Sequence, residues 1–278
     1  MRSHRSHPSH DGLQRLYAEV APTYERVNHA LTLGLDILWR RRTARRAAAV
    51  LARLSRRRGA PLRVLDACSG TGELAAAVAR RASGSVAVHL ADLSAPMLAG
   101  ARAKPHLSEA ALTVAAMESL PFADGAFDLI TVSFATRNLN RQLAVLRQCL
   151  REFHRILAPG GCYCQVETSQ PPNRIWRLLF HAYVAFTVRP IGRLISGSRS
   201  GYAYLAHTIP RFMTAAEFDA LLAETGFVGV GHELLGGGIG AIHWAARPAP
   251  APGAPEAEQP TADAMPYVQD PAGDAKEP

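Results

Sequence analysis

The sequence predicts an α/β fold in which helices cover both faces of a seven-stranded, mostly parallel sheet. Three observations indicate this class. Short apolar runs alternate with helical stretches through the middle of the chain, a glycine turn joins the first such run to a helix, and three glycines separate the last two runs. With 278 residues, 48% hydrophobic and 19% charged, the chain can bury one core. Disordered and collagen-like proteins are therefore excluded.

The individual elements follow from local composition. Apolar and β-branched runs between turn residues predict strands at 62–67, 85–91, 112–115, 127–134, 162–166, 228–235 and 239–246. Helical periodicity predicts helices at 73–81, 96–103 and 141–157. The last of these is expected to stop at the Ala-Pro-Gly-Gly run 158–161. The glycines at 236–238 are expected to join the last two strands as a closing antiparallel hairpin.

We expect one folded domain with a tail at each end. Residues 13–247 form the domain, and the polar residues 1–12 form an N-terminal tail. Residues 248–278 form a proline- and alanine-rich tail with six acidic residues and one lysine. We predict that this tail is disordered, because it has too little apolar surface to offset the entropy of ordering. The net charge of +8 therefore hides a strongly basic body.

Cysteine usage and the lack of targeting segments favour a reducing, cytoplasmic setting. The four cysteines are too irregularly spaced for a disulfide framework or a zinc site, and we expect no bound metal. Cys162 and Cys164 would face the same side of a strand as small buried residues. The polar N-terminal segment does not resemble a signal peptide, and no run of 18 uncharged apolar residues predicts a spanning helix.

Two segments outside the predicted sheet combine arginine with apolar residues. Residues 38–58 have the pattern of an N-terminal helix rich in arginine, whose charged face is either simply solvated or binds phosphate of nucleic acid or anionic lipid. Residues 171–212 form an insertion after the fifth strand, and the apolar run within it is too short to span a bilayer. This insertion is either ordinary helical core or a cap that admits an apolar substrate and shields it from water.

A strand, a glycine turn and a helix form a nucleoside-binding signature in residues 64–73. Gly70 and Gly72 let the backbone approach a ligand closely, and Asp92 ends the next strand, where its carboxylate can accept hydrogen bonds from ribose hydroxyls. Two of the three glycines of a dinucleotide fingerprint are absent, which favours S-adenosylmethionine, a cofactor without a pyrophosphate. The loop that starts at Asp66 resembles motif I of the class I S-adenosylmethionine-dependent methyltransferases, which have a Rossmann-like fold.

Further motifs resemble one family of these enzymes, the ubiquinone/menaquinone biosynthesis C-methyltransferases (UbiE/MenG). The resemblance covers residues 14–246, and two of its pieces are specific to the family: Ser133-Phe134-Ala135-Thr136-Arg137-Asn138-Leu139 and Tyr202-Ala203-Tyr204-Leu205. The supporting motifs are Tyr24-Glu25-Arg26-Val27-Asn28 with Leu31-Thr32 and Trp39, Ala91-Asp92-Leu93-Ser94, Glu118-Ser119-Leu120-Pro121-Phe122, Arg155-Ile156-Leu157-Ala158-Pro159-Gly160-Gly161 and Gly237-Gly238-Ile239. The chain departs from the family pattern at Asp36, where His is usual, at Ala158, Thr168 and Ala135-Thr136, and at Ala116-Met117, where Asn-Ala or Asp-Ala is typical.

The resemblance implies transfer of a methyl group from S-adenosylmethionine to a ring carbon of a polyprenylated quinol, with demethylmenaquinol as the favoured acceptor. Menaquinone and ubiquinone precursors share the same motifs, so the pathway stays open. The implied cofactor-binding residues are Asp66, Gly70, Thr71, Gly72, Asp92, Leu93, Ala116, Met117 and Ser133. Since Ala116 has no polar side chain, adenine recognition would depend on the Met117 backbone.

The chemistry of this transfer suggests roles for two further residues. A quinol carbon becomes a far better nucleophile once a ring hydroxyl has ionised, so catalysis needs alignment, a path for the proton and stabilisation of the phenolate. Arg137 follows the fourth strand, at the sheet edge where ligands bind. We predict that Arg137 stabilises the quinolate or orders a proton-relaying water, and that Asn138 orients the ring or that water. Glu167 and His207 are candidate bases that could equally be structural, and three tyrosines are expected to shape a pocket lid: Tyr24, Tyr202 and Tyr204.

Other functions fit parts of the pattern. An RNA methyltransferase is expected to show an Asn/Asp-Pro-Pro-aromatic motif or a nucleophilic cysteine after the fourth strand, and neither is there, so nucleic acid is not an expected partner. A small-molecule methyltransferase of secondary metabolism and a non-catalytic S-adenosylmethionine-binding protein are the alternatives. The expected partners are the quinol and, because the quinol is a lipid, an anionic membrane surface contacted peripherally. The sequence predicts no oligomeric state.

Overall fold

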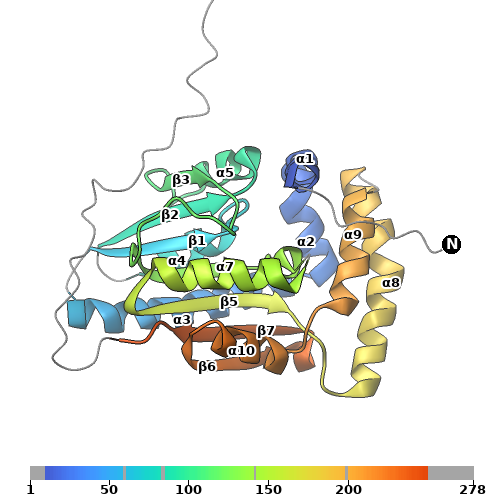
Figure 1. Cartoon of the computed structure of the whole chain (residues 1–278). Coiled ribbons are helices and arrows are strands. Elements are labelled where there is room, and N and C mark those ends of the chain that lie inside the picture. Colours follow the sequence, from blue (N-terminus) through green and yellow to red (C-terminus); the bar gives the residue numbers. More distant parts are fainter. Residues whose placement is uncertain (1–9, 59–60, 83–84, 141, 198–199, 250–278) are drawn as a thin grey trace, which may run out of the picture.

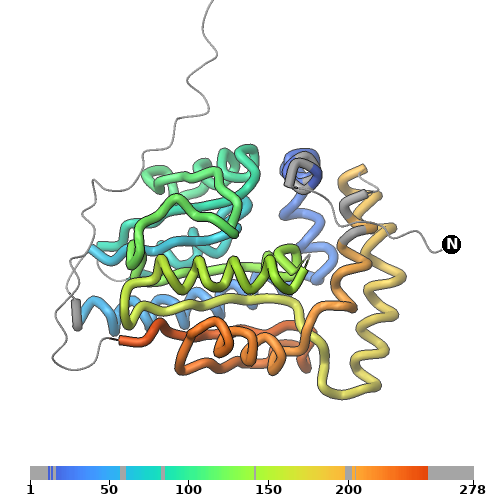
Figure 2. Tube along the Cα trace, viewed as in Figure 1, coloured from blue at the N-terminus to red at the C-terminus, as the bar shows by residue number. Residues whose placement is uncertain are grey.

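A computed structural model of the chain describes residues 10–58, 61–82, 85–140, 142–197 and 200–249 (Figures 1 and 2). The predicted C-terminal tail lies almost wholly outside these residues, as does most of the predicted N-terminal tail. The first helix, α1 (His10–Val20), begins inside the segment that was predicted as the N-terminal tail.

The sheet confirms the predicted fold class. Its seven strands lie in the order β3-β2-β1-β4-β5-β7-β6, and the first five in the chain run parallel. β7 runs antiparallel to both β5 and β6, which makes the predicted closing hairpin. The bounds are β1 Leu62–Ala67, β2 Val86–Asp92, β3 Ala111–Val114, β4 Phe127–Ser133, β5 Leu157–Thr168, β6 Val228–Leu235 and β7 Gly240–Ala246.

β5 begins five residues earlier than the sequence predicted, directly after α7 (Leu143–Ile156). The Ala-Pro-Gly-Gly run does stop the helix, but it enters the sheet instead of forming a loop. On one side Leu157 pairs with Phe127, and on the other the Arg247 N–H donates to the Gly161 carbonyl at 2.9 Å. A Cβ at Gly161 would stand 2.7 Å from the Ala158 carbonyl oxygen, so this tight entry into the sheet requires glycine.

Helices cover both faces of the sheet. On one face, α7 packs Leu150 and Phe153 against the sheet at β5, and α10 (Ala215–Glu224) packs Phe218 over β6 and β7. On the other face, α3 (Leu35–Arg58) and α4 (Glu73–Ala79) pack against β1, β4 and β5, and this layer also buries Cys162 and Cys164, as predicted. The remaining helical elements are η1 Ala21–Thr23, α2 Tyr24–Thr32, α5 Ala95–Arg102, α6 Thr136–Leu139, α8 Arg174–Ser196, α9 Ser200–Thr208, η2 Ile209–Arg211 and η3 Gly236–Gly238.

A separate helical layer stands beyond the carboxyl ends of the parallel strands. Figure 1 shows α8 and α9, both from the predicted insertion, as an outer wall, with α1 and α2 between this wall and the sheet. Val184 and Val188 of α8 pack with Val27 and Leu31 of α2 in a small apolar core of their own. The side chain of Asn173 starts α8 by accepting hydrogen bonds from two backbone N–H groups, each at 3.0 Å. The site lies between these helices and the sheet.

Candidate active site

Two adjoining cavities lie where the helical layer meets the ends of the strands. The larger has a volume of about 520 Å³, within the range of roughly 300–1,000 Å³ that is usual for small-molecule sites, and the smaller has about 90 Å³. Four residues belong to the walls of both cavities: Tyr17, Tyr24, Phe134 and Asn138. A group bound in one cavity therefore faces a group bound in the other.

The smaller cavity lies against the predicted glycine loop. Gly70 and Gly72 have φ angles of +54° and +74°, the left-handed conformation that glycine adopts without cost. A Cβ at Gly72 would stand 2.8 Å from Leu107 Cδ1, whereas a Cβ at Gly70 would meet open space. Cys68, at φ +52°, adopts the same conformation despite its side chain, and such strain is typical of functional loops.

Asp92 fixes this loop and also lines the smaller cavity. Its Oδ2 accepts a hydrogen bond from the Gly70 N–H at 2.8 Å, and its Oδ1 accepts one from the Ser94 N–H at 2.9 Å. Burial raises the pKa of Asp92, although these backbone donors oppose the effect. A carboxylate offers about four acceptor sites, and the backbone N–H groups of Gly70, Leu93 and Ser94 leave part of this capacity for a bound ligand.

The structure brings most of the predicted cofactor residues together. Gly70, Asp92, Leu93, Ala116, Met117 and Ser133 all line the smaller cavity. Glu118 lines it as well and was not among the predicted cofactor residues, although it begins the motif at residues 118–122.

Asp66 and two residues of the glycine loop, Thr71 and Gly72, lie outside both cavities. The Asp66 carboxylate is buried in β1 and accepts a hydrogen bond from Thr131 Oγ1 of β4 at 2.5 Å. Burial raises the pKa of Asp66 to about 7. In this structure Asp66 therefore ties together the strands beneath the loop.

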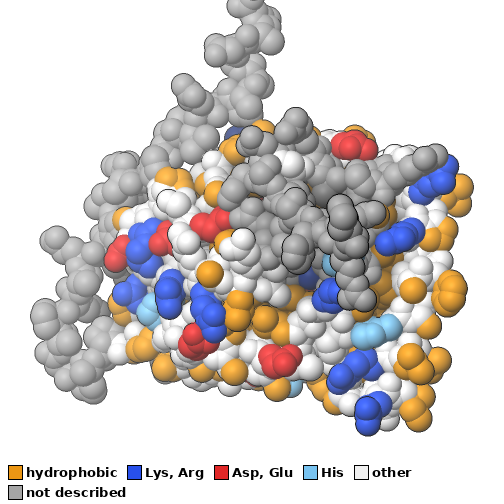
Figure 3. Space-filling model, turned by 45° about the vertical axis from the view of Figure 1, so that its right-hand side comes forward, with side chains coloured by type: hydrophobic (Ala, Val, Ile, Leu, Met, Phe, Trp, Pro, Cys, Tyr) orange, Lys and Arg blue, Asp and Glu red, His pale blue; other side chains and the backbone are white. Residues whose placement is uncertain are grey.

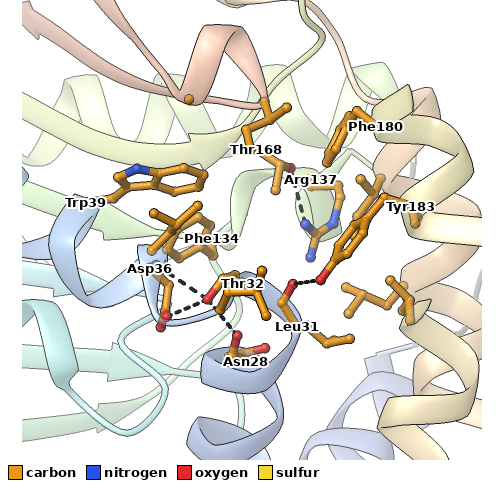
Figure 4. Close-up of a pocket in the computed structure, with 18 of the residues that line it drawn as sticks. Asn28, Leu31, Thr32, Asp36, Trp39, Phe134, Arg137, Thr168, Phe180 and Tyr183 are labelled. Carbon is orange, nitrogen blue, oxygen red and sulfur yellow. Dashed lines mark hydrogen bonds between the residues drawn. The ribbon is translucent and has the colours of Figure 1, made fainter. Parts of the chain in front are cut away.

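Arg137 follows β4 as predicted and lines the larger cavity. It is buried in the short helix α6, and Figure 4 shows its guanidinium directed into the cavity. Nη1 donates to Thr168 Oγ1 at 3.2 Å and lies 3.6 Å from Glu167 Oε1. Among the described residues, Arg137 Nε and Asn138 Oδ1 have no hydrogen-bond partner although both atoms are buried. A free donor and a free acceptor thus stand on adjacent residues.

Neither candidate base has the position that the role requires. The Glu167 carboxylate lies outside the cavities and accepts hydrogen bonds from Thr136 Oγ1 and from the N–H groups of Arg137 and Thr168, so its acceptor sites are used to hold Arg137. His207 is exposed on α9 and also lies outside both cavities. The structure therefore supports a positioning role for Glu167 and no role for His207 in the site.

A buried cation, Arg40, was not predicted. We expected the charged face of residues 38–58 to be solvated or to bind phosphate, yet the Arg40 side chain is only 6% exposed. Its Nε donates to Ser133 Oγ at 3.2 Å, Nη1 lies 3.2 Å from Glu73 Oε2, and its guanidinium carbon is 4.9 Å from the centre of the Phe134 ring. Arg40 therefore connects the smaller cavity, through Ser133, with the larger one that it lines itself.

Asp36, one of the departures from the family pattern, is the partner of this cation. Arg40 Nη1 donates to Asp36 Oδ2, which also lies 2.8 Å from His29 Nδ1, and Thr32 Oγ1 donates to Asp36 Oδ1 at 2.6 Å (Figure 4). These contacts lower the pKa of Asp36 although burial opposes them. A carboxylate at this position therefore fits the buried guanidinium beside it.

Most of the remaining wall of the larger cavity is aromatic or aliphatic. Trp39 and Phe134 line it from the sheet side, and Trp176, Phe180 and Tyr183 line it from α8 (Figure 4). The Tyr183 hydroxyl donates to the Leu31 carbonyl at 2.9 Å, which ties α8 to α2. Of the predicted lid tyrosines, Tyr24 and Tyr202 line this cavity, and the side chain of Tyr204 lies outside what the structure describes.

Comparison with known proteins adds independent information. Residues 5–247 match the model of the ubiE/COQ5 methyltransferase family. The demethylmenaquinone methyltransferase of Thermus thermophilus is 38% identical over 235 residues, which cover 84% of this chain and all of that protein. The ubiquinone/menaquinone biosynthesis C-methyltransferase UbiE of Geotalea uraniireducens is 32% identical over 83% of this chain and 94% of its own. The solved structure of the CurJ carbon methyltransferase shares the fold, with a TM-score of 0.50 at 18% identity, over 68% of this chain and 49% of that protein.

Proposed function

The chain belongs to the ubiE/COQ5 methyltransferase family, and from this premise we propose that it methylates a ring carbon of a polyprenylated quinol, with demethylmenaquinol as the acceptor. It is an S-adenosylmethionine-dependent C-methyltransferase of quinone biosynthesis. The observation that carries the proposal is the shared wall between a cavity against the glycine loop and a larger apolar cavity. Such a wall is what a transfer between a polar donor and an apolar acceptor needs.

The residues around the smaller cavity fit S-adenosylmethionine. Asp92 has acceptor sites left for ribose hydroxyls, and Gly70 leaves the loop open toward the ligand. Glu118 offers a carboxylate near Ala116, where the family's polar side chain is absent. When bound, S-adenosylmethionine supplies a methyl group activated on a sulfonium sulfur. Because about 90 Å³ is too little for this ligand, α1 and α2, which carry Tyr17 and Tyr24, are expected to move outward on binding.

The larger cavity suits the acceptor. Its volume accommodates a quinol ring and the first part of a prenyl tail, and its aromatic and aliphatic walls favour both. Burial raises the pKa of Tyr24, while the charges of Arg40 and Arg137 act in the opposite direction. Tyr24 is itself a phenol at the shared wall, so a quinol hydroxyl there would meet the same two opposing effects, of which burial is the larger. Both arginines would stabilise the quinolate.

Arg137 and Asn138 are the proposed catalytic residues. A buried donor without a partner costs about 1–3 kcal/mol, and Arg137 Nε is relieved of this cost when an oxyanion accepts its hydrogen bond. Asn138 Oδ1 is a free acceptor beside it, which can accept a hydrogen bond from a quinol hydroxyl or from a water that carries the proton away. Glu167 keeps the guanidinium in place, and its own acceptor sites are filled. Arg137 would therefore favour the ionised form of the ring, and Asn138 would orient the ring or the water that receives the proton.

We further propose that the enzyme works from the cytoplasm at an anionic membrane surface. A polyprenyl tail is insoluble in water, so the acceptor is held in a bilayer, and the basic body of the chain is attracted to anionic headgroups.

Mass spectrometry of lipid extracts tests the reaction. The purified full chain is incubated with S-adenosylmethionine and, separately, with reduced demethylmenaquinol and with a 2-methoxy-6-polyprenyl-benzoquinol. We expect one added methyl group on the first. Methylation of only the second would reassign the pathway to ubiquinone. If neither quinol gains a methyl group while the Thermus thermophilus relative methylates its substrate in the same assay, the quinol assignment is wrong. A binding measurement with S-adenosylmethionine then distinguishes two explanations: a protein that binds the cofactor has a different small acceptor, and one that does not bind it lacks a working cofactor site.

A further inference from the structure

The outer face of α8 exposes a set of large apolar side chains. Ile175, Leu178, Phe186 and Leu194 are 72%, 70%, 80% and 86% exposed. At 100° per residue, all four fall within one half of the helix circumference. Figure 3 shows hydrophobic side chains gathered along this side of the molecule, with basic ones between them. A contiguous exposed apolar patch with a polar rim marks an interaction surface.

The charge of this region has one sign. Between Glu167 and Glu217 the sequence contains no acidic residue, and its charged residues there are all arginines: Arg174, Arg177, Arg189, Arg193, Arg199 and Arg211. Two of them, Arg189 and Arg193, are exposed on the same half of α8 as the apolar side chains. A helix surface that combines apolar side chains with arginine suits the boundary between acyl chains and anionic headgroups, because the long arginine side chains can reach the headgroups. The same charge disfavours a second copy of this chain as the partner, because two such faces would oppose arginine to arginine.

The opposite face of α8 packs against the rest of the protein. We expected the apolar run of this segment to be too short to span a bilayer, but within the described residues the 23-residue helix α8 is long and apolar enough by length and composition, because its most apolar 18-residue window has a mean hydropathy of 1.2. Only 17% of that window is buried, unlike a core helix. Val184 and Val188 pack against α2, and Phe180 lines the larger cavity. The helix therefore lies along a surface, with one face on the enzyme and the other free.

The exposed face continues into the rim of the larger cavity. Leu179 and Trp176 of α8 line this cavity and are 54% and 42% exposed. Across the opening, Leu33, in the turn between α2 and α3, lines it too and is 80% exposed. The cavity holds a ring and only part of a long tail, so the rest of the tail stays outside, next to these residues.

Resting on the proposed quinol acceptor, we infer that the outer face of α8, together with Leu33, is the surface by which the enzyme lies on an anionic bilayer. In this orientation the cavity opens into the acyl region, and the quinol head reaches Arg137 without crossing water. Arg189 and Arg193 face the headgroups. The partner is thus a lipid surface, and its binding depends on both apolar insertion and charge.

Vesicle binding by the full chain tests the surface. The variant Phe186→Ser/Leu194→Ser removes two exposed side chains that do not line either cavity. The matched control, Val228→Ser/Leu234→Ser, changes two exposed apolar residues of β6, which are 48% and 41% exposed. We expect the wild type and the control to co-sediment with phosphatidylglycerol-containing vesicles, and the α8 variant to bind at least about tenfold more weakly.

Two activity measurements separate this inference from the proposed reaction. The α8 variant is expected to methylate a short-chain, water-soluble demethylmenaquinol at the wild-type rate and to lose activity on a long-chain quinol embedded in vesicles. Wild-type vesicle binding by the α8 variant overturns the inference. So does a wild-type dimer that does not bind vesicles and that the α8 variant converts to a monomer. If neither quinol is methylated but the variant still loses vesicle binding, the surface stands and the proposed reaction fails.

Discussion

Arg137→Lys is the sharpest test of the proposed catalytic site. The substitution keeps a positive charge beside Glu167 but removes the planar fork, and with it the Nε donor that has no partner in the protein. Arg137→Ala would be harder to interpret. Glu167 is 1% exposed, and leaving it without a cation is expected to destabilise the fold by about 3–5 kcal/mol. Lysine therefore separates the loss of a directed donor from the loss of charge.

The expected magnitude follows from the role. A donor aimed at a developing oxyanion contributes about 2.7–4 kcal/mol, so kcat is expected to fall by about 10²–10³-fold. Because the quinol must ionise without this help, we expect the deficit to shrink as pH rises toward the pKa of the quinol itself. KM for S-adenosylmethionine should change little, since Arg137 lines only the larger cavity.

The assay is single-turnover methyl transfer to a short-chain demethylmenaquinol at saturating S-adenosylmethionine, followed across pH, with thermal unfolding measured in parallel. Arg147→Lys is the matched control. Arg147 donates from Nε to Glu224 Oε1 at 2.8 Å on the surface, where such pairs contribute about 1 kcal/mol or less, and its rate should be that of the wild type. The assignment of Arg137 is refuted if Arg137→Lys keeps both kcat and kcat/KM.

Four further substitutions test the cofactor side and the strands beneath it. Asp92→Asn replaces one charged acceptor by a donor, so we expect the Kd for S-adenosylmethionine, measured by calorimetric titration, to rise by about 10–100-fold; an unchanged Kd would remove Asp92 from the site. Both glycines have a positive φ, so either substitution by alanine strains the backbone, but a Cβ at position 72 also meets Leu107 Cδ1 at 2.8 Å whereas one at position 70 meets open space. Gly72→Ala should therefore lower the melting temperature more than Gly70→Ala, which should also weaken cofactor binding; equal melting temperatures would contradict this. The folded pKa of Asp66, about 7, lies above the 3.8 of an ordinary aspartate, so the native state holds a proton that the unfolded chain releases, and stability is lost as pH rises through this window. Asp66→Asn cannot titrate, so its free energy of unfolding relative to the wild type should increase by on the order of 4 kcal/mol between about pH 4 and 7; parallel urea-unfolding curves at the two pH values would refute the shift.

The sheet could be predicted because every strand carries the same kind of local sequence pattern. Each strand reads as an apolar run between turn residues, and the hairpin is marked by the glycines at 236–238, so the seven strands were found with small errors at their ends. The early start of β5 was missed because proline and glycine signal a stop for a helix but do not say whether the chain then enters a loop or a sheet edge.

Side-chain burial explains why the site was only partly predictable. Gly70 and Asp92 could be predicted from the sequence because a glycine loop and the end of a strand restrict where such residues lie. Arg40 is one of many arginines in a single helix, and which of them is buried depends on how α3 packs against β4 and α4, a tertiary property. Likewise, Asp66 matches a motif residue in the sequence, but only the structure shows that its carboxylate accepts a hydrogen bond from Thr131 of the neighbouring strand.

The wall shared by the two cavities has a consequence for inhibitor design. Tyr17, Tyr24, Phe134 and Asn138 border both cavities, so one molecule with a nucleoside at one end and an apolar ring at the other could occupy both at once. Joining two weak ligands makes the second binding step intramolecular, with an effective concentration in the millimolar range for a short linker, and affinity can rise by about 10²–10⁴-fold over either half. The linker would take the place of the transferred methyl group. Selectivity over other S-adenosylmethionine enzymes would come from the half of the compound that fills the apolar cavity.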